Sequence, residues 1–323
     1  MHNSICVITA YFGCFPKYFS LWLKTCGENP GIDFIVFSDA IYDGQLPDNV
    51  RIENMTLNGM KVLASEKMHM EVSLEQPYKC CDFKPLYGTI FHDYISEYSY
   101  WGHCDIDLMF GDLSYFLKKY EYKKYDKFLP LGHLCLYRNT EKVNLYYTLP
   151  GSHNGDYKEV FSNPQSYWFD ELGGIFQIYL TNKLPMFTKR IFADITHKYK
   201  RYRLSELAYL DEPVTNYDYK VFYWENGKTY RAYIENGIVK YEEFMYVHFQ
   251  KRPNFEIDFD VDLVDAFYIT NQGFIPKESE GISKDDIQRY NRFNGGIYEK
   301  AEILLWSLKE IKKKVLTRIW GNK

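Results

Sequence analysis

Three aspartates interrupt an otherwise apolar and aromatic stretch, YSYWGHCDIDLMFGDL. Asp105 and Asp107 stand two positions apart at the end of a predicted strand, so their carboxylates point to the same face. An uncompensated buried carboxylate is costly, and two converging carboxylates suit Mg²⁺ or Mn²⁺ held together with a diphosphate. Asp112 lies past the strand, at the start of a helical pattern, and is expected to cap that helix.

The same spacing occurs a second time in IDFDVDLVD, at Asp258, Asp260 and Asp262. This segment fails as an EF-hand loop because Leu263 occupies the glycine position. We interpret it as an exposed strand face without a metal role. The first copy differs because it follows a hydrophobic strand.

His248, in the segment YVHFQKRP, is the next candidate. A lone histidine is more often a structural hydrogen-bonding residue, but a neutral imidazole is also a good Mn²⁺ ligand. Lys251 and Arg252 follow directly and can neutralise a diphosphate leaving group. The cluster therefore favours anion binding.

The N-terminal pattern predicts the elements that position these residues. A β-branched run over 5–13 is followed by helical spacing at Phe19, Leu21 and Leu23 and by a second strand over 33–40. Strand, helix and strand at this spacing predict a βαβ unit, hence an α/β fold whose ligands lie beyond the carboxyl ends of the strands. A further helical pattern begins at Pro85.

Later segments are less regular. Residues 127–139 predict one strand, and residues 150–167, rich in Gly, Asn, Ser and Pro, predict a mobile loop that ends before a short helix. Two Glu-Asn-Gly turns flanked by aromatic strands predict a β-meander that delivers His248. Apolar positions from Leu304 to Ile319, opposed by lysines, predict a basic amphipathic helix.

Bulk properties exclude several classes of protein. A net charge of -4 argues against a general nucleic-acid binder. No apolar run reaches the roughly 18 residues of a membrane-spanning helix, and the N-terminus lacks the pattern of a signal peptide. Seven cysteines without a C-x-x-C pair fit a reducing compartment, so we expect a cytoplasmic protein.

Taken in order, several segments resemble the landmarks of a bacterial family of glycosyltransferase-like proteins of surface-polysaccharide biosynthesis: YKCCDFKPLYG, WGHCDIDLMFGDL, GHLCLYRN, FDELGG and YVHFQKR. More distantly they resemble the glycogenin-like GT-A transferases. The resemblance covers roughly residues 5–255. It implies a GT-A fold, a Rossmann-like mixed sheet flanked by helices, over residues 1–255. Residues 256–323 would form a C-terminal extension that ends in the basic amphipathic helix.

The resemblance also implies roles for single residues. Asp105 and Asp107 would hold Mn²⁺, or Mg²⁺, and the donor diphosphate, with His248 as the third protein ligand. The expected donor is a UDP-sugar. Residues at two strand ends, at a helix start and in the late motif would contact this nucleotide-sugar: Thr9, Ala10, Tyr11, Asp39, Asp82, Lys84, Lys251 and Arg252. Asp39 and Asp82 have structural explanations as well, in closing a turn and capping a helix.

Asp170 and Glu171 sit where an inverting enzyme of this type places its catalytic base. In a retaining enzyme the pair would bind the acceptor instead, and both outcomes stay open. The implied acceptor is a surface polysaccharide or an oligosaccharide linked to a polyprenyl diphosphate. The C-terminal helix, with Trp306 and Trp320, is expected either to lie on the anionic inner face of the cell membrane or to pack on the domain.

Two other functions remain open. A metal-dependent nucleotidyltransferase would use the same carboxylates but would attack the α-phosphate of its substrate. A carbohydrate-binding protein would keep the fold without catalysis and would offer its many aromatic side chains to a glycan, independently of Mn²⁺.

Overall fold

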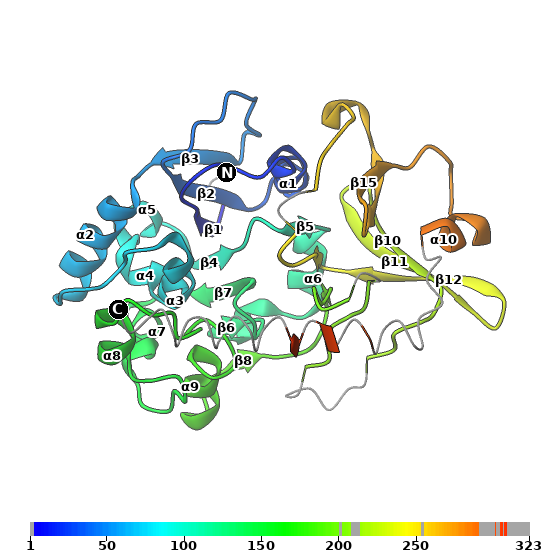
Figure 1. Cartoon of the computed structure of the whole chain (residues 1–323). Coiled ribbons are helices and arrows are strands. Elements are labelled where there is room, and N and C mark those ends of the chain that lie inside the picture. Colours follow the sequence, from blue (N-terminus) through cyan, green and yellow to red (C-terminus); the bar gives the residue numbers. More distant parts are fainter. Residues whose placement is uncertain are drawn as a thin grey trace. The chain divides into compact units, whose positions relative to one another are not determined.

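The computed structural model describes residues 3–199, 202–207, 214–252 and 255–290, together with 301, 304, 305, 307 and 308. The chain divides into two compact units, Met1–Ile191 and Phe192–Lys323 (Figure 1). The boundary expected after residue 255 falls inside the second unit, between β13 (Tyr246–His248) and β14 (Ala266–Thr270).

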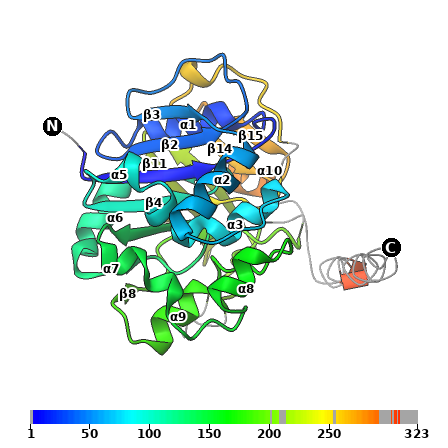
Figure 2. The same ribbon diagram turned by 90° about the vertical axis from the view of Figure 1, so that its left-hand side faces the viewer.

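The first unit is built on a seven-stranded sheet in the order β3-β2-β1-β4-β7-β6-β8, seen in Figure 2 with β3 near the top and β8 near the bottom. Its strands are β1 (Ile5–Ala10), β2 (Asp33–Ser38), β3 (Val50–Asn54), β4 (Tyr100–Cys104), β6 (Lys127–Phe128), β7 (Leu134–Arg138) and β8 (Met186–Phe187); the short β5 (Leu108–Phe110) follows β4. Strands β1 to β4 pair in parallel, whereas β7 pairs antiparallel with β4 and β6. The predicted α/β class is confirmed as a mixed sheet flanked by helices.

Helices cover both faces of this sheet. Trp22 of α1 packs on Phe34 of β2, while Phe37 of the same strand stacks on Phe91 on the opposite face. The helices are α1 (Phe19–Gly27), α2 (Leu57–Met68), α3 (Cys80–Phe83), α4 (Tyr87–Ile90), α5 (His92–Ile95), α6 (Leu113–Lys119), α7 (Glu141–Asn144), α8 (Tyr157–Ser162) and α9 (Ile175–Thr181). Short 3₁₀ turns join them: η1 (Pro77–Lys79), η2 (Lys84–Leu86), η3 (Tyr122–Lys124) and η4 (Tyr146–Thr148).

The strand order reverses at β1. The chain runs from β1 outward through β2 to β3 and then returns to place β4 on the other side of β1. The carboxyl ends of β1 and β4 are therefore neighbours, and the Thr9 hydroxyl donates to the Cys104 carbonyl at 3.0 Å. In open α/β sheets the crevice at such a reversal is the usual ligand site.

Most predicted elements of the first unit are confirmed, including β1, α1, β2 and β4. Asp112 caps α6, as expected, by accepting a hydrogen bond from the Tyr115 amide at 2.8 Å. The single strand predicted over 127–139 is wrong, because Pro130 and Gly132 separate β6 from β7. The segment 150–167 is not wholly a loop, because it contains α8.

The second unit holds a five-stranded antiparallel sheet in the order β12-β11-β10-β14-β15. Its strands are β10 (Lys220–Glu225), β11 (Lys228–Glu235), β12 (Ile238–Phe244), β14 and β15 (Gly273–Pro276). The helix α10 (Lys284–Tyr290) follows β15 in the chain. Asn226 and Gly227 form one hairpin turn, with φ of 49° and 75°, and Asn236 and Gly237 form the other, with φ of 51° and 73°. Two successive positive φ values are those of type I′ turns, which confirms the predicted meander.

Outside this sheet, β9 (Ala193–Asp194) pairs in parallel with β13. The second aspartate triplet is exposed, as expected, but the predicted strand is wrong. Asp260 instead caps η5 (Val261–Leu263) by accepting from the Asp262 amide at 3.0 Å.

Little of the predicted C-terminal helix can be compared with the structure. Leu304 and Leu308 are described and exposed, whereas Trp306, Trp320 and the basic residues of this helix lie outside the described residues. The predicted contact of this segment with a membrane therefore stays a prediction. Within the part of the chain that the structure describes, every helix is too short or too polar to cross a bilayer.

Candidate functional site

Two carboxylates lie at the carboxyl end of β4, beside the end of β1. Asp105 follows the strand directly, and its amide donates to the His133 carbonyl at 3.0 Å. An oxygen of Asp105 and an oxygen of Asp107 lie within 4.8 Å of each other, and both residues are half-buried. Two converging oxygen donors that keep some exposure fit a hard divalent cation that also binds ligand oxygens.

Lys84 is the buried cation of this site. Its Nζ lies 2.6 Å from Asp105 Oδ1 and 3.1 Å from Asp170 Oδ2, and it donates to the Gly132 carbonyl at 3.0 Å. Burial lowers the pKa of Lys84, but the two carboxylates outweigh burial and hold that pKa well above its usual value. Lys84, Asp105 and Asp170, predicted separately from sequence, thus form one ion-pair chain.

Asp170 is almost wholly buried, at 2% exposure, shortly before α9. Oδ1 has no hydrogen-bond partner among the described residues, although Oδ2 pairs with Lys84. Burial raises the pKa of Asp170 to about 7 despite the opposing effect of Lys84, and the neighbouring Glu171 adds to the rise. A carboxyl group that titrates near neutrality can accept and return a proton at physiological pH.

Gly132 allows this arrangement. A Cβ at this position would lie 2.3 Å from Asp170 Oδ2, so any larger residue would push the carboxylate away from Lys84. Gly132 was not among the predicted site residues. A glycine inside an expected strand is nevertheless a signal of close approach by another group.

Asp82 lies outside this chain of ion pairs. It is fully buried and pairs with Lys79 at 2.8 Å. Its two oxygens also accept the amides of Tyr167 and Phe169, at 2.9 and 2.8 Å. Asp82 therefore holds the loop that leads to Asp170, a role that neither helix capping nor the predicted nucleotide-sugar contact describes.

The end of β1 supplies the next predicted residues. Thr9 is buried on Cys104, and Ala10 pairs with Phe37 of β2. Burial raises the pKa of Tyr11, and the negative charge of Asp107 raises it further, so this phenol lies within electrostatic reach of the acidic pair.

Asp39, at the end of β2, ties two loops together. Its Oδ1 accepts the amide of Gly13 at 2.9 Å, and Gly13 has a φ of 101° that favours glycine. The same loops line a surface hollow of about 680 Å³ formed by residues 13–17, 19, 20 and 39–42. Phe15 and Tyr42 give this hollow aromatic walls.

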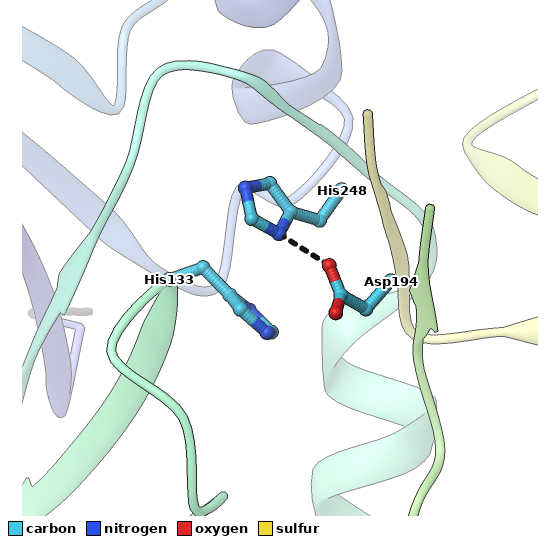
Figure 3. Close-up of side chains that lie close together, drawn as sticks. All are labelled: His133, Asp194 and His248. Atoms are coloured by element: carbon cyan, nitrogen blue, oxygen red, sulfur yellow. Dashed lines mark hydrogen bonds and ion pairs between the residues drawn. The ribbon is translucent and has the colours of Figure 1, made fainter. Parts of the chain in front are cut away.

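His248 belongs to the second unit and ends β13 as predicted. Its Nδ1 lies 2.8 Å from Asp194 Oδ1, as Figure 3 shows. When Nδ1 carries the proton and donates to this carboxylate, Nε2 becomes the acceptor nitrogen. Gln250 also donates to Asp194, at 2.5 Å. Asp194 was not predicted, because its link to His248 depends on strand pairing between residues far apart in sequence. Gln250 lies two residues after His248 but was not predicted either, because its contact is made with Asp194.

Arg252 and Lys251 follow in the same unit. The guanidinium of Arg252 donates to the carbonyls of Phe249, Gln250 and Thr196 and stacks on Tyr202, so it stabilises the local backbone. Lys251 is exposed with a φ of 45°. The predicted phosphate contacts of both residues, and the metal role of His248, stay predictions.

Comparison with known proteins finds one family. A model described as a family of unknown function, DUF6625, matches residues 7–278, which is most of the chain. A search of characterised proteins returns no match.

Proposed function

The chain belongs to DUF6625, a family of unknown function, and we propose that it is a metal-dependent glycosyltransferase of GT-A type. The enzyme moves a sugar from a nucleotide diphosphate, of which UDP is the first candidate, to a surface polysaccharide or a lipid-linked oligosaccharide. The observation that carries the proposal is the acidic pair Asp105 and Asp107 at the carboxyl end of β4, next to the reversal of strand order at β1.

The position of the pair supports a donor site. A nucleotide bound at the strand reversal lies along the loops after β1 and β2, where the aromatic hollow and Asp39 are found. Phe15 and Tyr42, whose ring centroids lie 6.5 Å apart in an edge-to-face contact, would offer aromatic surface to a base, and Tyr11 is within electrostatic reach of Asp107. The diphosphate then falls at the acidic pair.

Asp105 and Asp107 would hold the divalent cation, which when bound neutralises the charge of the leaving diphosphate. Lys84 fixes the Asp105 carboxylate through a contact of 2.6 Å and supplies a positive charge on the protein side of the site. Because Lys84 also contacts Asp170, the same ammonium links the metal ligand to the group that titrates near neutrality.

Asp170 supplies the proton chemistry. With a pKa of about 7, a large share of its carboxyl groups is ionised at neutral pH and can take the proton of an acceptor hydroxyl. Oδ2 is engaged by Lys84, whereas Oδ1 is buried and has no hydrogen-bond partner among the described residues, so the proposal requires that the bound acceptor gains access to Oδ1. If the enzyme retains configuration instead, Asp170 and Glu171 bind the acceptor.

A thermal-shift experiment tests the donor site. The wild-type chain and Asp105→Ala/Asp107→Ala are heated with UDP, GDP and CDP, with and without Mn²⁺. Binding to the native state raises the melting temperature by linkage. We expect one nucleotide to stabilise the wild type in Mn²⁺ and to leave the double variant unchanged.

The chain contains its own control. Asp258→Ala/Asp260→Ala removes an identically spaced but exposed pair from the second unit, and its response should equal that of the wild type. If no nucleotide stabilises the wild type, or if the Asp105→Ala/Asp107→Ala variant responds equally, the proposal is wrong. Release of intact sugar 1-phosphate during turnover would indicate the nucleotidyltransferase instead.

A further inference from the structure

Two large aromatic side chains are exposed beside each other in the first unit. Trp168, in the loop between α8 and α9, and Tyr78, in η1, are each 55% exposed. The indole N–H of Trp168 donates to the Tyr78 hydroxyl at 3.2 Å. The hydrogen bond satisfies the indole N–H of Trp168 and fixes the orientation of its ring relative to the ring of Tyr78.

The backbone around Trp168 is held from several sides. The buried Asp82 accepts the amides of both flanking residues, Tyr167 and Phe169. The Trp168 carbonyl accepts the Glu171 amide at 3.1 Å and the Asn154 side chain at 3.1 Å. Trp168 itself has a φ of 52°, a left-handed conformation that is rare for a bulky residue and that recurs at binding sites. An exposed tryptophan is thus presented on a rigid frame.

This aromatic pair adjoins the ion-pair chain. Trp168 precedes Asp170 by two residues, and burial raises the pKa of Tyr78, an effect to which the charge of Asp170 also contributes. The ammonium group of Lys84, whose charge acts on Tyr78, is buried and engaged by carboxylates, and so is the ammonium group of Lys79. Such surroundings favour an uncharged ligand over a phosphate.

We propose that Trp168 and Tyr78 form a saccharide-binding platform. A pyranose ring presents one face of C–H bonds that packs on an aromatic ring, while its hydroxyls remain available to polar groups at the rim. The platform would hold the acceptor glycan with a hydroxyl directed toward Asp170. That role in catalysis rests on the proposed function, whereas saccharide binding itself does not.

Saturation-transfer NMR on the full chain tests the platform without Mn²⁺ or nucleotide. Maltopentaose, cellopentaose and chitopentaose serve as neutral probes, and UMP serves as the charged nucleotide probe. We expect at least one oligosaccharide to bind the wild type. Trp168→Ala should weaken the affinity for this oligosaccharide about tenfold or more, because one aromatic stack is lost. Trp168→Phe should retain most of the affinity. Tyr115→Ala removes a comparably exposed ring from α6 of the same unit and should change nothing.

The outcomes separate this inference from the donor site. Saccharide binding that survives in Asp105→Ala/Asp107→Ala but depends on Trp168 supports the platform even if no nucleotide binds. The platform is refuted if none of the three oligosaccharides binds, or if Trp168→Ala binds them as the wild type does. It is also refuted if only UMP depends on Trp168. Circular dichroism of each variant confirms that the fold is intact.

Discussion

The ionisation of Asp170 gives the sharpest prediction. Its pKa rises from the usual 3.8 to about 7 in the folded chain, so the folded state holds the proton more tightly than the unfolded state. Between these two values the unfolded carboxyl is ionised while the folded one is protonated, and stability therefore falls as pH rises. Each pH unit in this window corresponds to about 1.4 kcal/mol, which gives on the order of 4 kcal/mol in all.

Asp170→Asn removes this titration and retains an oxygen acceptor for Lys84. Urea unfolding of the wild type and of this variant should be compared from about pH 4 to pH 8. We expect the stability of the wild type relative to the variant to fall with increasing pH and to level off above pH 7, because one proton sets a slope of at most about 1.4 kcal/mol per pH unit.

Asp93→Asn is the matched control. Asp93 is exposed and pairs with Lys67, which lowers the pKa of its carboxyl, so its contribution should be constant from about pH 5 upward. A flat difference for Asp170→Asn would refute the reasoning. So would a difference that rises with pH, because Lys84 would then dominate and keep Asp170 ionised throughout.

Two further predictions concern the supports of the site. Gly132→Ala should lower the free energy of unfolding by about 1–3 kcal/mol in urea titrations, since its Cβ would overlap Asp170 Oδ2; an unchanged value would contradict the close approach. Lys79→Met should cost about 3–5 kcal/mol by leaving Asp82 buried without its cation, and hydrogen exchange should rise first at Tyr167 and Phe169. Equal exchange in wild type and variant would show that the pair does not hold this loop.

Local sequence signals predicted much of the fold. The Asn-Gly turns require two successive positive φ values, and Asp112 caps the helix next to it, so both were predictable from a few neighbouring residues. The alternation around Asp105 and Asp107 correctly placed both carboxylates at the end of β4. These features depend on backbone preferences that a short segment determines by itself.

The remainder depends on contacts between distant segments. Lys84 and Asp170 are 86 residues apart, and no periodicity or spacing indicates that they pair. Asp82 was singled out for a different role, and its partners Tyr167 and Phe169 lie at and just beyond the end of the segment 150–167, whose composition suggested only a loop. Trp168 gave no signal at all, because a left-handed backbone at a tryptophan contradicts its intrinsic preference.

The central position of β1 also constrains how the chain folds. Its pairing with β2 joins neighbouring segments, whereas the hydrogen bond from Thr9 to Cys104 closes a loop of 95 residues. During synthesis β1, β2 and β3 can pair while β4 is still missing, which leaves one edge of β1 with unpaired backbone groups and apolar side chains such as Val7 and Ile8. Insertion of β4 covers this edge and brings Asp105 into position in the same step. A folding intermediate that lacks β4 is therefore both without its acidic pair and prone to aggregate.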